Sequence, residues 1–125
     1  MAEYGSEGAI RIADDVVAVI AGLAATKTKG IAGMSGGITE GWAKRVSGKN
    51  VTKGVTVEVG QVETAIDLRV IVDYGTKIHE LSRDLQVNVK EAVETMTGLS
   101  VVEVNVKVEG VYFKEESTEP ERSIK

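Results

Sequence analysis

The sequence contains no cysteine and a single histidine, His79. The absence of cysteine excludes a disulfide framework, thiolate zinc sites, a cysteine nucleophile and thiol redox switching. Glu80 lies beside His79 and Ser82 lies three residues on, but a serine nucleophile also needs a third group to orient the imidazole ring. We therefore interpret His79 as a partly exposed residue of an amphipathic helix.

The chain has many glycines but lacks the glycine motifs that bind nucleotides. The Gly48-Lys49 pair is followed by Asn50, where a P-loop needs serine or threonine, and the position of its first glycine is occupied by Ala43. The dinucleotide pattern Gly-x-Gly-x-x-Gly is also absent. We expect no cofactor and no bound metal.

Long hydrophobic runs are absent too. The longest, Val16 to Ala25, is about half of the ~20 residues that cross a bilayer, and Gly22 interrupts it. The N-terminus is polar and acidic, unlike a secretion signal. We expect a cytoplasmic protein with no direct membrane insertion, peripheral at the inner face of the membrane only where a partner holds it there.

Charge is distributed unevenly. The chain has 15 basic and 19 acidic residues, a net charge of −4. The segment 27–53 contains six basic residues and only one acidic residue, Glu40, so that it carries +5 and the remainder −9. This basic segment is either a solvated surface or a site for an anionic partner, including the acidic face of another copy.

The length of 125 residues is that of one domain. We predict a flexible N-terminus over 1–7, a single domain over 8–113, and a solvated acidic tail over 114–125, where Glu, Ser, Thr and Pro predominate.

The first half predicts a strand at Gly8–Ile12 and a helix that Asp14 or Asp15 opens and that Thr26–Gly30 ends. The 25 residues 30–54 contain seven glycines, and in them we place an edge strand at Ile31–Met34 and a helical turn near Trp42–Val46. The predicted buried stripe of the helix is Val16, Val17, Ile20, Leu23 and Ala24.

The second half shows clearer alternation. Strands are predicted at Val55–Val59 and Ile66–Asp73 with a turn at Gly60-Gln61, a helix at about Thr76–Thr97 with Gly98 as its cap, and a strand whose inward residues start at Val102. The inward helix residues are predicted to be Ile78, Leu81, Leu85, Val89, Ala92, Val93 and Met96. The order β-α-(β)-β-β-α-β indicates a two-layer α+β fold with two helices on one face of a mostly antiparallel sheet.

Charged side chains also gather on the predicted open face of the sheet. Asp67, Arg69 and Asp73 share one side of a strand, where we expect them to pair across strands with Glu58, Glu103 or Lys107. Such a face lacks a pocket, and we predict no catalytic residue and no enzyme activity.

The remaining features are typical of contact surfaces, because Trp, Tyr and Arg are enriched at binding hot spots. Trp42 lies in the glycine-rich basic segment and either closes the core or binds a partner, while Phe113 is expected to close the end of the core unless Val111–Phe113 forms an exposed sticky edge after the last strand. Our candidate partner-binding residues are Trp42, Lys44, Arg45, Lys49, Tyr74, Tyr112 and Phe113.

A nucleic-acid-binding module is the alternative. Gly33-Met34-Ser35-Gly36 matches the Gly-x-x-Gly loop with which KH domains clamp a backbone, and it lies within the basic segment 27–53. A four-residue glycine pattern is weak evidence in a chain with 14 glycines.

In order and spacing, several segments resemble the alkaline shock protein family, the cell-envelope stress response proteins of Gram-positive bacteria. They are Gly8–Ile12 leading into Val16–Ala21, Gly30-Ile31, Gly54-Val55, Val72–Gly75, Gln86–Val89, Glu94–Leu99 and Val104–Val106. The resemblance implies a non-enzymatic cytoplasmic scaffold, acting in envelope stress or homeostasis through protein partners: as a homo-oligomer, on an integral membrane anchor, or both. The glycine-rich segment Gly33–Gly41 departs from the family pattern.

Overall fold

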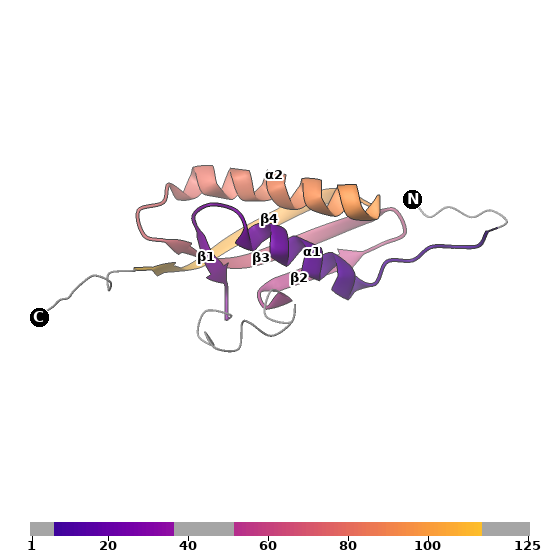
Figure 1. Ribbon diagram of the computed structural model, residues 1–125, viewed down its shortest axis with the longest axis horizontal. Helices are drawn as coiled ribbons and strands as arrows, with labels where there is room; N and C mark the ends of the chain where they lie inside the picture. The colour runs from indigo at the N-terminus through magenta and orange to yellow at the C-terminus, as the bar shows by residue number, and fades with distance from the viewer. Residues whose placement is uncertain (1–6, 37–51, 114–125) are drawn as a thin grey trace, which may run out of the picture.

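The structure is a computed structural model that describes residues 7–36 and 52–113. Its elements are α1 (Asp14–Thr26), β1 (Ile31–Met34), β2 (Val55–Val59), β3 (Glu63–Asp73), α2 (Ile78–Thr97) and β4 (Ser100–Tyr112). The two helices lie beside each other over one face of a single sheet (Figure 1). The predicted two-layer α+β fold is confirmed.

The central strand β3 has different neighbours on its two sides. On one side β2 pairs with Thr64–Leu68 and β1 with Val70–Val72, both antiparallel. On the other side β4 runs parallel to the whole of β3, from Glu63↔Ser100 to Asp73↔Tyr112. A parallel pair needs a crossover connection, and α2 supplies it. Two of the three pairings are antiparallel, as expected, but the longest is parallel.

Arg69 lies on β3 between the part that pairs with β2 and the part that pairs with β1, and its backbone bonds the residue before β2 and the residue after β1. Its N–H donates to the Gly54 carbonyl at 2.8 Å, and its carbonyl accepts from the Ser35 N–H at 2.8 Å. A Cβ on Gly54 would lie 2.7 Å from the Arg69 carbonyl oxygen, and the φ of Gly54 is +82°. Both observations explain why a glycine directly precedes β2.

The core lies between the helices and one face of the sheet. The alternating residues of β3 from Ile66 to Val72 are at most 1% exposed and pack against α2 and α1. The helices contribute the other fully buried residues of the core, which are Leu85, Val89, Val93, Val17, Ala21 and Ala25. Burial of apolar surface contributes about 25 cal/mol per Å², so this layer provides most of the stabilisation.

The predicted strand at Gly8–Ile12 is wrong. Only Gly8 makes a single bridge, and residues 9–13 have no regular structure. Ile10 is 70% exposed, whereas Ile12 packs against the core. A strand requires a partner edge, and two alternating isoleucines do not provide one.

The faces of both helices differ in part from the prediction. On α1, Val16 and Leu23 are 46% and 42% exposed, because the helix turns a smaller surface inward that includes Ala18, Ala21 and Ala25. On α2, Ile78 and Met96 are 43% and 70% exposed, because these end residues extend past the sheet-facing stripe. The predicted edge strand β1 and the left-handed cap at Gly98, with φ +77°, are confirmed.

The last strand is longer than predicted and contains two irregularities. An extra residue of β4, Val102, lies opposite the step from Thr64 to Ala65 of β3, so that Val101 faces inward and Val102 is 55% exposed, contrary to the prediction for Val102. Val104, Val106 and Val108 face the core, as predicted. A second extra residue of β4, Glu109, lies opposite the step from Val70 to Ile71. Val111 and Tyr112, predicted to follow the strand, are part of it.

Candidate functional site

Three of the seven predicted partner-binding residues come together where β3 and β4 end. Tyr74, Tyr112 and Phe113 form what we call the aromatic cluster. Trp42, Lys44, Arg45 and Lys49 lie outside the described residues, so their role stays a prediction. The same holds for the helical turn near Trp42–Val46, residues 1–6 and the tail 114–125.

The aromatic cluster is held by backbone and ring contacts. The Tyr74 N–H donates to the Tyr112 carbonyl at 3.0 Å, which extends the β3–β4 ladder by one residue. The Tyr74 and Phe113 rings meet edge to face, with centroids 5.1 Å apart. Their exposed fractions are 70% for Tyr74, 44% for Tyr112 and 64% for Phe113. The expectation that Phe113 closes the core is wrong, because the ring packs on Tyr74 at the surface.

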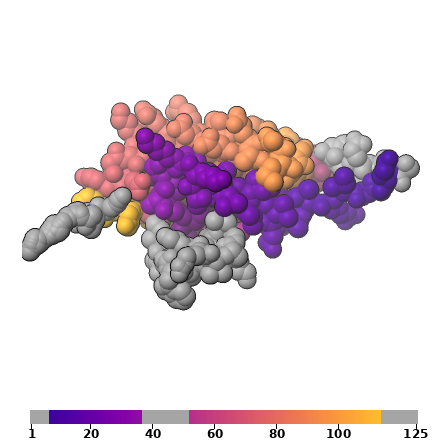
Figure 2. Space-filling view, in the orientation of Figure 1, coloured from indigo at the N-terminus to yellow at the C-terminus, as the bar shows by residue number. Residues whose placement is uncertain are grey.

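The cluster lies at one end of the elongated molecule. In Figure 2 the yellow end of β4 emerges there, below the first turns of α2. Val111 adds a further apolar side chain that is 52% exposed. Exposed apolar residues of this size, gathered in one place, mark interaction sites more often than single ones do.

Polar side chains of α2 bond the free edge of β4 at its beginning. Gln86 Nε2 donates to the Val104 carbonyl at 2.9 Å, and Lys90 Nζ donates to the Val101 carbonyl at 3.2 Å. The Val101 N–H donates to Glu94 Oε2 at 2.9 Å. We call Val101–Val104 the sealed half of the edge. The sequence analysis missed these residues, although Gln86, Lys90 and Glu94 recur every four residues along one helix face.

The environment of the Glu94 carboxyl shifts its pKa. The hydrogen bond from the Val101 N–H lowers the pKa of its carboxyl below the ordinary value of 4.5. The hydrogen bond and charge of Lys90, 3.2 Å away, lower this pKa further, and desolvation opposes them. The carboxylate therefore holds the strand edge in its ionised form.

From Asn105 to Tyr112 the same edge is open. Backbone groups alternate between the two sides of a strand, and the Val104 carbonyl, bonded by Gln86, points away from β3. Since the register is regular from Val104 to Val108, the N–H and C=O groups of Val106 and Val108 also point away. Within the described residues nothing bonds them there. We call Asn105–Tyr112 the open half.

The outer face of the sheet is polar, as predicted, but its pairing differs in detail. Asp67 accepts a bond from Asn105 Nδ2 at 2.7 Å, rather than pairing with a charged residue. Arg69 lies opposite Lys107, and among the described residues it makes no ion pair. Lys107 approaches Glu109 at 3.8 Å, and Glu109 also accepts the Ser35 hydroxyl.

His79 and Ser82 do not form a catalytic pair. His79 is exposed, as predicted, and no bond joins it to Ser82 within the described part of the chain. No helix in residues 7–36 and 52–113 combines the length and hydrophobicity needed to cross a bilayer.

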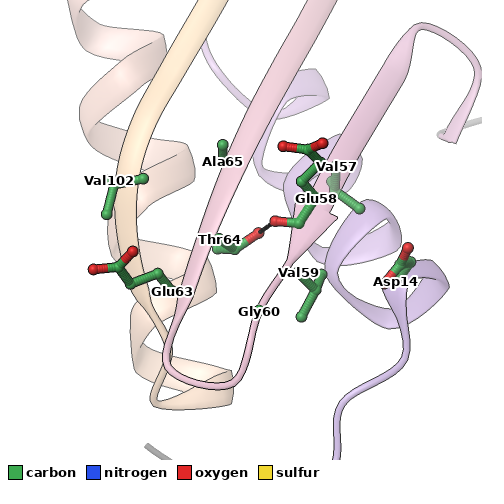
Figure 3. A pocket seen from close by; sticks show the side chains of 9 residues that line it. All are labelled: Asp14, Val57, Glu58, Val59, Gly60, Glu63, Thr64, Ala65 and Val102. Atoms are coloured by element: carbon green, nitrogen blue, oxygen red, sulfur yellow. Dashed lines mark hydrogen bonds between the residues drawn. The ribbon is translucent and has the colours of Figure 1, made fainter.

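A groove of about 510 Å³ lies between the start of α1 and the β2–β3 turn. Its carboxylates come from three elements, Asp14, Glu58 and Glu63, and Figure 3 shows them spread around the rim. The buried Thr64 hydroxyl is bonded to the Glu58 carbonyl at 2.9 Å. In the described ranges no three acids or histidines are grouped as ligands for a metal. The groove is therefore lined by carboxylates that do not point toward one common position.

The segment Gly33–Gly36 is built into the sheet. Gly33 and Met34 belong to β1, and Met34 is 2% exposed. The next residue, Ser35, bonds Arg69 through its N–H and Glu109 through its hydroxyl. Half of the Gly-x-x-Gly segment is thus paired strand, which differs from a free clamping loop.

The sequence matches a known protein family over most of its length. Residues 2–113 match the model of the alkaline shock protein family, which is described as having a "cell envelope-related function". The chain belongs to this family. The resemblance inferred above from short segments is therefore confirmed.

Curated relatives cover most of the chain. Proteins YqhY and YloU of Bacillus subtilis are 33% and 39% identical over 112 and 106 residues, 90% and 83% of this chain and 83% and 88% of theirs. A stress response regulator gls24 homolog of Streptococcus pyogenes serotype M3 is 36% identical over 110 residues, 87% of this chain and 62% of that protein. A solved MamM CTD structure aligns with 77% of this chain and 94% of its own, at 14% identity and a TM-score of 0.47.

Proposed function

We propose that this family member is a non-enzymatic binding protein of the cell-envelope stress response or of envelope homeostasis. It acts as a scaffold, by self-association, by docking on a membrane-bound partner, or by both. The family description supports the link to the envelope, and the relative named as a stress response regulator supports the link to stress. The observation that carries the binding role is the exposed aromatic cluster.

Burial of these exposed rings against a partner would be favourable, because it removes apolar surface from water. Three of the five aromatic residues of the chain form the cluster, and Tyr74 and Phe113 are both more than half exposed. Full burial of one such side chain is worth about 1.5–3 kcal/mol. Tyrosine also adds a hydroxyl that bonds at the polar rim of an interface.

The proposed location follows from the proposed partner. We place the protein in the cytoplasm, with a fraction at the inner face of the membrane where an integral membrane protein holds it. The aromatic cluster, at one end of the molecule, leaves the helical layer and the outer sheet face accessible to further contacts.

Recovery of partners with the full chain as bait tests this proposal. We expect the unmodified chain to retain one integral membrane protein from a detergent-solubilised membrane fraction of its native cell. The Tyr74→Ser/Phe113→Ser variant should lose at least tenfold of that protein. Met96→Ser is the matched control, because Met96 is as exposed as Tyr74, 70%, but lies on α2.

A contrasting result would favour the nucleic-acid alternative. That result is micromolar binding to mixed RNA that weakens steeply with salt, as release of counterions from several phosphates requires. Its loss in the Lys44→Glu/Arg45→Glu variant, with the aromatic variant unaffected, would overturn the proposal.

A further inference from the structure

We propose that the open half of β4 pairs antiparallel with the open half of β4 from a second copy, in a register centred on Val108. The inference rests on the proposed function and specifies its self-association surface. A two-fold axis through the Val108 pair would then join two four-stranded sheets into one.

The first support is the contrast in hydrogen bonding along one edge. In the sealed half, α2 side chains bond the carbonyls of Val101 and Val104 and the N–H of Val101. In the open half, Val106 and Val108 present N–H and C=O groups outward that nothing in the described residues bonds. An unprotected strand edge is a template for another strand, and an identical edge is present on every copy.

The second support is the position of the open half. Because α2 covers the edge up to Val104, an added strand has access only from Asn105 to Tyr112. In a two-fold antiparallel pair this span is centred next to Val108. Val108 also belongs to the set of residues whose backbone groups point outward, so Val108 can face its own copy in a hydrogen-bonded pair. Glu109 is an extra residue of β4 with no partner on β3, and beyond it the Tyr112 carbonyl faces β3, so the symmetric pairing is short and centred on Val108.

The third support is charge. A register centred on Val108 places Lys107 opposite Glu109 of the second copy, and symmetry repeats this pair. A centre on Lys107 would oppose two lysines, and a centre on Val106 would oppose Glu103 and Glu109. Lys107 and Glu109 already lie 3.8 Å apart on the outer face, so the four side chains would alternate in sign.

The fourth support is apolar surface at the ends of the pairing. The Val108 register brings Val111, which is 52% exposed, level with Asn105 of the second copy. Beside that position a groove of about 180 Å³ separates α2 from β4. Two of its lining residues, Val87 and Val102, are 51% and 55% exposed, and pairing would reduce the exposure of this surface.

Charge reversal tests the interface. Sedimentation equilibrium of the full chain should show a monomer–dimer equilibrium that Lys107→Glu weakens about tenfold, because two ion pairs become two repulsions. The Lys107→Glu/Glu109→Lys swap should restore dimerisation. Lys29→Glu changes the net charge equally but lies before β1, and it should leave the equilibrium unchanged. Circular dichroism verifies that each variant is folded.

Disulfide formation tests the register. The natural chain has no cysteine, so single substitutions report cleanly. Residues 107 and 109 of two copies would form a non-hydrogen-bonded pair, with Cα atoms about 4.5 Å apart, within disulfide reach. Under mild oxidation a mixture of Lys107→Cys and Glu109→Cys chains should cross-link at least fivefold more than either variant alone.

Several outcomes would overturn this inference. They are a monomer at millimolar concentration, an unchanged dimer in Lys107→Glu, a swap that fails to restore dimerisation, or cross-linking without preference for the mixture. Each leaves the recovery of a membrane partner untouched. Conversely, RNA binding in place of partner binding would overturn the proposed function without changing the sedimentation result.

Discussion

The two halves of the β4 edge show how the same strand is treated in opposite ways. Val101–Val104 is bonded by Gln86, Lys90 and Glu94, three side chains of the helix that crosses over it. Asn105–Tyr112 continues past the reach of those side chains and ends in exposed aromatic rings. The helix thus protects one half from strand addition and leaves the other half available.

The difference has a geometric cause. The sealing residues run from the middle of α2 (Gln86) towards its end (Glu94), at intervals of four residues, so they face only the beginning of β4. The α2 helix runs antiparallel to β4, and its first turns lie near the opposite end of the strand (Figure 1). There α2 presents the exposed Ile78 and His79 rather than edge-bonding polar groups.

Removing the core anchor of α2 should have the largest effect. Leu85 is 0% exposed and holds α2 against the sheet, so Leu85→Ala should destabilise the fold by about 2–5 kcal/mol. Urea denaturation measures this loss. Val87→Ala, two residues on and 51% exposed, should change stability by less than ~0.5 kcal/mol. Equal effects of the two variants would contradict the described orientation of α2.

Amide hydrogen exchange should resolve the two halves directly. In dilute protein the Lys107 N–H, which faces β3, should exchange about 100-fold more slowly than that of Val108, which faces outward. The Val101 N–H, held by Glu94, should also be slower than that of Val108, by about tenfold. Slow exchange at Val108 in a dilute monomer would contradict an open edge.

The sequence predicted the strands best where one face alternates without ambiguity. From Ile66 to Val72 apolar and polar residues alternate nearly throughout, and the predicted strand and its buried face were confirmed. The crossover helix and its glycine cap were also predictable, because Gly98 stands where the helical pattern stops.

Adjacent valines caused the errors of phase. Val101 and Val102 are equally apolar, so alternation alone cannot decide which faces the core, and a bulge settles it. Val16 and Val17 pose the same problem on α1, where the smaller surface turns inward. The candidate site was predicted only in part, since the aromatic residues were named but the free edge depends on strand order, a non-local property.

Acid should abolish the contribution of Glu94 to the seal. Its pKa is lowered on folding, so the stability it provides is present above about pH 4.5 and is lost as pH falls through the folded pKa. Glu94→Gln should therefore lower the thermal midpoint at pH 7, and the difference from the natural chain should vanish near pH 2. The exposed Glu91→Gln is the control, with little expected change. A deficit of Glu94→Gln that persists in acid would contradict the role of charge.

The contact between Tyr74 and Phe113 should give the smallest effect, and it decides whether the open half ends in an ordered surface. Edge-to-face aromatic pairs contribute about 0.5–1.5 kcal/mol beyond burial, and with both rings more than half exposed we expect about 0.5 kcal/mol. A double-mutant cycle of Tyr74→Leu and Phe113→Leu, measured by urea denaturation at concentrations where the chain is monomeric, isolates this coupling. The Phe113→Leu/Met96→Leu cycle should give none. Zero coupling in both would mean that the rings are unordered before a partner binds, and that ordering them lowers the affinity.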